Sequence, residues 1–166
     1  MRLEPFGKFT MRYARASWHR PYGGKEGLGY GDGDGELTGE ITGSLTWANY
    51  PRRREDGVWM PNVRGQIHTA DGADILMSVH GQSVAERAAG QKRALLVRIE
   101  LTTEAPAYRW LNTCFLVGEG EIDEELDDAW IAAFVCINDG AAGPPAVGDA
   151  PPERFRKQYP DEGATL

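Results

Sequence analysis

The segment Trp59–Val79, WMPNVRGQIHTADGADILMSV, constrains the fold most, because polar and apolar residues alternate on both sides of a turn signal. Such alternation is typical of an antiparallel β-hairpin. A two-residue loop, Asp71-Gly72, would mix polar and apolar residues on both faces. A three-residue loop, Ala70–Gly72, pairs Thr69 with Ala73 and gathers the apolar residues on one face. That face consists of Val63, Ile67, Ile75, Met77 and Val79. We therefore predict the three-residue loop, with Gly72 in the left-handed conformation.

The opposite face of this hairpin is polar, and it has two interpretations. It carries Asn62, Arg64, Gln66 and His68, which would lie opposite His80, Ser78, Leu76 and Asp74. One face of an antiparallel sheet usually meets solvent, which is the first interpretation. In the second, these side chains line the lumen of a barrel, and a subunit partner or a long loop covers the apolar face.

The rest of the chain is rich in strand patterns and poor in helical ones. Strands are predicted at Lys8–Ala14, Leu37–Trp47, Val58–Thr69, Asp74–Gly81, Ala94–Thr103, Arg109–Val117 and Ala129–Ile137. The Gly-rich segment Tyr22–Glu36 is predicted to be a loop, with or without a short extended piece, and Ser83–Gln91 a short helix with the spacing of a capping box. About seven or eight strands favour an all-β barrel or sandwich over alternating strands and helices. We expect one barrel domain at 1–139, followed by a loose tail at 140–166 that is rich in Pro, Gly and charge.

Composition excludes several classes of protein. The 166 residues carry a net charge of −7, which argues against general binding to nucleic acid. No apolar run is long enough to span a membrane, and the first residues do not resemble a signal peptide, so we expect a cytoplasmic protein. The two cysteines, Cys114 and Cys136, lie in apolar patterns and are expected to be buried free thiols.

Two longer segments resemble a known family. They are LTGEITGSLTWANYPRRREDGVWMPNVRGQIHTADGADILMSVHG and APAYRWLNTCFLVGEG, with T-x-DGA and Y-x-WLN in that order. The chain from about Gly24 to Ile137 is similar to the bacterial domain-of-unknown-function family 3237. The resemblance implies a small antiparallel β-barrel of about eight strands, similar to the calycin or allene-oxide-cyclase type. No activity is established for the family as a whole, so the resemblance implies no catalytic residue.

No cofactor or metal site is predicted. The Gly-rich run Gly23–Gly35 lacks the preceding strand, the following helix and the Lys-Ser/Thr ending of a phosphate loop. Its acidic residues lack the spacing of a calcium loop. His68 and His80 share a face but lie too far apart for one zinc ion to bridge them. The triple Arg52–Arg54 is interpreted as a solvated turn, with docking of a carboxylate or phosphate as the alternative.

The candidate ligand site combines aromatic surfaces with a few polar groups, as ligand pockets do. Two-residue spacing on a predicted strand would place Tyr108, Trp110 and Asn112 on one face. Trp47, Asn62 and Arg64 are predicted to join them from neighbouring strands. We expect a homodimer that binds a small organic ligand. It is either a cofactor-independent isomerase, cyclase or lyase, or a non-catalytic carrier.

Overall fold

The computed structural model describes residues 1–85, 92–125 and 127–137. Its elements are β1 (Arg2–His19), β2 (Gly27–Gly39), β3 (Gly43–Asn49), β4 (Arg52–Arg53), β5 (Trp59–Met60), β6 (Asn62–Thr69), β7 (Asp74–Ala85), β8 (Lys92–Thr102), the 3₁₀ helix η1 (Pro106–Thr113), β9 (Leu116–Asp123) and β10 (Asp128–Ile137). Within the described ranges, no helix is long and apolar enough to cross a membrane.

Eight of the strands close into an antiparallel barrel. Their order around the ring is β1–β2–β3–β6–β7–β8–β9–β10, and β1 closes it by pairing with both β2 and β10. Closure leaves these strands without the long unpaired edges that favour aggregation. The predicted all-β barrel of about eight strands is confirmed.

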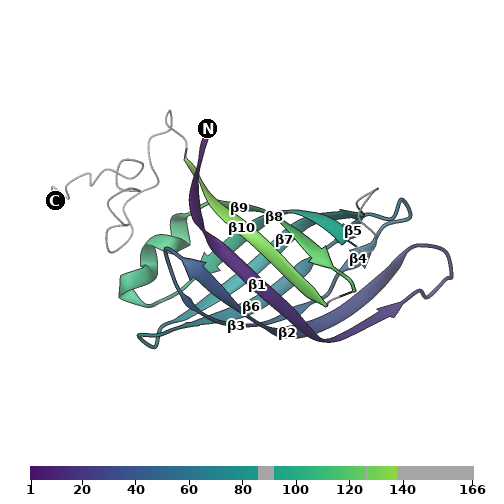
Figure 1. The fold of residues 1–166 in the computed structure, drawn as a ribbon, viewed down its shortest axis with the longest axis horizontal. Helices are drawn as coiled ribbons and strands as arrows, with labels where there is room; N and C mark the ends of the chain where they lie inside the picture. Colours follow the sequence, from purple (N-terminus) through teal and green to yellow (C-terminus); the bar gives the residue numbers. More distant parts are fainter. Residues whose placement is uncertain (86–91, 126, 138–166) are drawn as a thin grey trace.

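The two ends of the barrel are finished differently (Figure 1). The strands β1, β2 and β7 have 18, 13 and 12 residues and extend past β3 and β6, which have seven and eight. The short strands β4 and β5 fill the gap between β2 and β7, through the pairs Gly27–Arg53 and Trp59–Ser83. The helix η1 lies at the opposite end.

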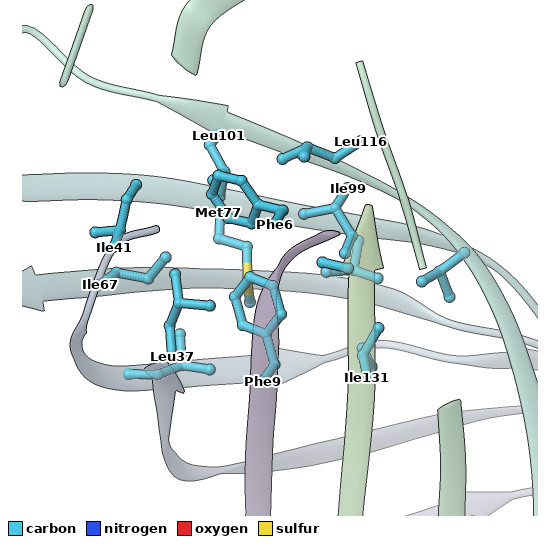
Figure 2. Packing of buried hydrophobic residues seen from close by; sticks show 14 of the residues in the cluster. Phe6, Phe9, Leu37, Ile41, Ile67, Met77, Ile99, Leu101, Leu116 and Ile131 are labelled. Carbon is cyan, nitrogen blue, oxygen red and sulfur yellow. The ribbon is translucent and has the colours of Figure 1, made fainter. Parts of the chain in front are cut away.

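The core fills the barrel between these ends. Alternate residues of each strand point inward because successive side chains of a strand lie on opposite faces. Figure 2 shows the packing of this cluster, in which Phe9, Leu37 and Ile67 are at most 1% exposed. Such a core explains why one face of nearly every strand is apolar.

The hairpin prediction is confirmed in register and in loop length. The Thr69 and Ala73 backbones are hydrogen-bonded, His68 pairs with Asp74, and Gly72 has a φ of 85°. Val63, Ile67, Ile75, Met77 and Val79 are all buried. The polar face meets solvent, as in the first of the two interpretations, since Asn62, Arg64 and His68 are exposed.

Several local predictions were wrong. Leu37–Trp47, expected as one strand, turns back on itself between β2 and β3, so that Leu37 pairs with Gly43. Gly27–Glu36, expected within a loop, belongs to β2, because hydrogen bonding to both β1 and β3 outweighs the weak strand preference of glycine. Arg109–Val117, expected as a strand, lies largely in η1, where consecutive residues Trp110 and Leu111 are both buried. Ser83–Ala85 of the expected helix belongs to β7. The remainder, residues 86–91, and the tail at 140–166 lie outside the described residues.

Candidate functional site

A hollow of about 310 Å³ opens at the barrel end that β4 and β5 complete, and we call it the mouth cavity. Its aromatic walls come from strands that are distant in sequence: Tyr13 and Trp18 of β1, Tyr30 of β2 and Trp59 of β5. Its polar lining includes Asn49, Ser83, Arg93, Asp123, Glu124 and Asp127. Aromatic walls with a few fixed polar groups are the usual composition of a small-molecule site.

Tyr13 forms the inner boundary of the cavity. Its ring meets Trp47 edge to face, with ring centroids 4.6 Å apart, and Trp47 Nε1 donates to the Asp34 carbonyl at 2.9 Å. The Tyr13 hydroxyl accepts a hydrogen bond from Asn49 Nδ2 at 3.4 Å. Burial raises the pKa of Tyr13, the Asn49 bond lowers it, and the charges of Glu124 and Asp127 raise it. The phenol is therefore neutral at physiological pH.

Asn49 is itself held in place, which fixes its amide toward Tyr13. Its side chain is 5% exposed, and Oδ1 accepts a hydrogen bond from the Asn62 backbone N–H at 3.0 Å. The same side chain thus joins the end of β6 to the phenol of β1. This arrangement restrains both groups before any ligand binds.

Arg93, near the start of β8, is the buried cation of the cavity at 8% exposure. Its Nε donates to Ser83 Oγ at 3.1 Å, and Nη2 donates to the carbonyls of Gly57 at 3.2 Å and Ser83 at 3.1 Å. Burial lowers the pKa of Arg93, Glu124 raises it, and Arg53 lowers it, but a guanidinium keeps its charge. Nη1 has no hydrogen-bond partner within the described part of the chain.

Two tryptophans form the outer wall. Trp18 and Trp59 lie with ring centroids 4.4 Å apart, and the Trp59 ring also receives the guanidinium groups of Arg53 at 5.6 Å and Arg93 at 5.4 Å. Cation–π contacts of this kind hold β5 against β4 and β8. Trp18 Nε1 is buried and, in the described ranges, has no hydrogen-bond partner.

Acidic side chains from the β9–β10 turn line the rim. Asp123 accepts from the Glu125 backbone N–H at 3.0 Å and lies 3.7 Å from Lys92 Nζ. Glu124 Oε1 lies 3.6 Å from Arg93 Nε, and its side chain is 43% exposed. Asp127 is exposed as well. Among the residues described, no three His, Cys, Asp or Glu side chains are grouped so that they could hold a metal ion.

The structure does not bring the six predicted site residues together. Asn62 and Arg64 are exposed on the outer face, where Arg64 Nη1 lies 2.7 Å from His80 Nε2. Trp47 lies inside the barrel beside Tyr13.

The other three residues lie in η1, at the far end of the barrel. Trp110 packs near Phe6 at 6.3 Å, Tyr108 donates to Asp71, and Asn112 bonds the Thr103 backbone. These three residues were predicted as a site because a strand would place them on one face. That prediction was wrong, because the segment is a 3₁₀ helix.

Most residues of the mouth cavity were not predicted from the sequence. Tyr13 lies in the predicted strand Lys8–Ala14, but nothing in the sequence distinguished it from a core residue. Arg93 and Trp59 are separated by 33 intervening residues, and only the β5–β7–β8 pairing brings them together. The available signal was aromatic residues near strand ends, namely Trp18 near the end of the long strand β1 and Trp59 at the start of the short strand β5.

Comparisons with known proteins bear on the fold. No protein-family model matches the chain, and no curated protein matches it. The structure is similar to a β-barrel-like protein from Acinetobacter baumannii (TM-score 0.71, 19% identity, covering 81% of this chain and 94% of that chain). A protein of unknown function from Clostridium acetobutylicum is also similar (TM-score 0.72, 16% identity, 82% and 99%). So is an enzyme from Penicillium herquei (TM-score 0.61, 19% identity, 81% and 94%).

These structural similarities establish the barrel fold. At sequence identities below 20% they show the fold and not the function. Membership of family 3237 stays a prediction from the sequence.

Proposed function

We propose that the mouth cavity binds a small, planar, partly apolar organic molecule and converts it without a cofactor, as an isomerase, cyclase or lyase. One observation carries this proposal: aromatic walls surround a partly buried neutral phenol, Tyr13, whose hydroxyl proton has no acceptor among the described residues. A planar molecule that packs against the contacting pair Trp18 and Trp59 would present a polar atom to that proton.

The chemistry requires one proton donor and one proton acceptor. Tyr13 donates its proton to an electron-rich atom of the bound molecule, and a rim carboxylate, Glu124 or Asp127, takes a proton from another atom. The substrate gains one proton and loses one, so the reaction is redox-neutral. Water at the open mouth carries the proton from the carboxyl group back to the tyrosinate. One of the similar structures is that of an enzyme, which supports this interpretation.

A non-catalytic carrier is the second candidate. It is favoured because, among the described residues, no carboxylate is hydrogen-bonded to the Tyr13 hydroxyl, whose partner is Asn49. A carrier needs only the aromatic walls and the donors. The two candidates differ in whether bound molecules exchange protons.

The test uses 2-tetralone, a bicyclic ketone whose C–H groups next to the carbonyl are weakly acidic. We expect it to quench tryptophan fluorescence and to raise the melting temperature. An enzyme will speed deuterium exchange from D2O into these positions, measured by NMR, and Tyr13→Phe will abolish the acceleration while binding persists. Binding with exchange at the buffer rate supports the carrier. Absence of binding by 2-tetralone and by other bicyclic aromatic probes contradicts the proposed function.

A further inference from the structure

The unmatched hydrogen-bonding groups around the mouth cavity are donors. Trp18 Nε1, Arg93 Nη1 and the Tyr13 hydroxyl have no acceptor among the described residues, and all three side chains line the cavity. Just behind the wall, Arg53 Nε is a fourth such donor, buried beside Trp59. Of these donors, Trp18 Nε1 and Arg53 Nε are fully buried, where a donor without an acceptor is costly in a folded protein. A bound acceptor would satisfy donors that line the cavity.

The rim carboxylates differ in whether they contact Arg93, one of these donors. Asp123 is engaged by the Glu125 N–H and lies near Lys92, at the edge of the cavity. Asp127 is exposed, and no ion pair to Arg93 is found for it within the described ranges. Glu124 alone among these acids approaches Arg93.

The Arg93–Glu124 contact is a weak one. The Oε1–Nε distance of 3.6 Å is longer than a hydrogen bond, and Nε already donates to Ser83. Arg93 is buried and tied to two carbonyls, whereas the Glu124 side chain is 43% exposed and gains hydration by turning outward. An ion pair of this kind contributes little and is easily exchanged.

We propose that the natural ligand is a planar aromatic oxyanion, such as a carboxylate or an enolate, whose charged oxygen binds the unoccupied Arg93 Nη1 and, by repulsion, turns Glu124 away from the guanidinium. This inference rests on the proposed function and names its ligand class. The ring stacks on Trp18 and Trp59, and the Tyr13 hydroxyl supplies a second donor. An enolate is also the species that proton removal from a ketone produces, so Arg93 would stabilise the intermediate of the proposed reaction.

The test compares 2-naphthoate with its neutral isostere 2-naphthamide, by calorimetry or fluorescence. In wild-type protein we expect naphthoate to bind more tightly than naphthamide. Glu124→Gln removes the competing anion but keeps the side-chain shape, and should tighten naphthoate binding about tenfold. Naphthamide affinity should change by less than about twofold, because it carries no charge.

Asp127→Asn is the matched control for Glu124→Gln. It removes the same charge from the same rim without touching Arg93, so it should tighten naphthoate binding by less than about threefold. An equal effect of the two substitutions would show general repulsion instead of displacement and would overturn the proposal. So would unchanged or weaker naphthoate binding by Glu124→Gln.

Arg93→Met should weaken naphthoate binding at least about tenfold and leave naphthamide binding largely intact. Because Arg93 also joins β5 and β7 to β8, the thermal unfolding of the Arg93→Met protein is measured in parallel. If Arg93→Met fails to fold, Arg93→Lys, which keeps the charge, is used in its place. Arg53→Met removes the other guanidinium on Trp59 and should leave the preference for naphthoate over naphthamide unchanged. Equal binding of both compounds to wild type overturns this inference and leaves the proposed function standing, whereas binding of neither contradicts both.

Discussion

Gly72 offers the cleanest test of the β6–β7 turn. Its φ is 85°, and no atom lies within 4 Å of the place where a Cβ would be. A side chain there meets no clash, so its cost is backbone strain alone. We expect Gly72→Val to lower the free energy of unfolding in urea by about 1 kcal/mol or more, because a β-branched residue resists positive φ. Gly72→Asn should cost less, since Asn tolerates this conformation; equal stability of Gly72→Val and wild type would refute the argument.

Cys114 is predicted to be chemically inert in the folded protein. Burial raises the pKa of its thiol to about 12, and burial also raises the pKa of Cys136. The thiolate is the reactive species, so its population at neutral pH is very small. Iodoacetamide should therefore modify both cysteines slowly in buffer and fully in guanidinium chloride, as mass spectrometry can follow. Rapid modification of Cys114 in the native state would contradict its burial.

Tyr13 should make stability fall at alkaline pH. Its pKa is raised above the usual 10.0, chiefly by burial, so the folded state keeps the proton that the unfolded state loses. The stabilisation is complete below the unfolded pKa and is lost as the pH rises through the folded pKa. We expect the free energy of unfolding to decline less steeply between about pH 9 and 11 in Tyr13→Phe than in wild type. Parallel curves for the two proteins would be evidence against a buried phenol.

The helix η1 depends on Asn112, which joins it to the end of β8. Its Oδ1 accepts from the Thr103 N–H at 2.8 Å, and its Nδ2 donates to the Thr103 carbonyl at 2.9 Å. Asn112→Ala leaves both backbone groups without these partners and should destabilise the protein by about 2 kcal/mol. Binding at the mouth cavity should persist, because that cavity lies at the other end. Asn62→Ala, at an exposed position, should lower the free energy of unfolding by less than about 0.5 kcal/mol. Loss of ligand binding in Asn112→Ala would indicate that the ligand site lies at η1.

The outer face of β8, β9, β10 and β1 is the expected surface for self-association. Leu96 and Leu3 are 68% and 49% exposed there, beside Val117 and Phe134 across a shallow groove. Arg98 and Glu119 line the same groove, so a second copy related by two-fold symmetry could present opposite charges to them. We expect a dimer by sedimentation that Leu96→Glu dissociates.

The matched control for that dimer is Leu76→Glu, because Leu76 is 59% exposed but lies on β7, outside the groove. It should leave the dimer intact. A strict monomer for wild type at high concentration, or dissociation by both substitutions alike, would count against this surface.

The hairpin could be predicted completely from the sequence because all its determinants are local. Alternating side chains choose the buried face, and the Ala70–Gly72 loop sets the register. The conformation of Arg109–Val117 could not be predicted by the same reasoning. Alternation assumes that one face is buried, whereas Trp110 and Leu111 are adjacent and both buried. Pro106 at the first turn is compatible with a helix start, and burial of both Trp110 and Leu111 at the end of the barrel favours the helix over a strand.

The strand class, the hairpin and the apolar inner face thus follow from the amino-acid sequence by itself, since side-chain alternation and turn chemistry act over a few residues. The mouth cavity was decided by the tertiary structure. Closure pairs Arg12 with Asp128, far apart in the chain, and only then do Tyr13, Trp59 and Arg93 meet around one hollow. Burial in that hollow raises the pKa of the phenol and leaves donors unmatched. No local pattern encodes this, because it arises from which strands become neighbours.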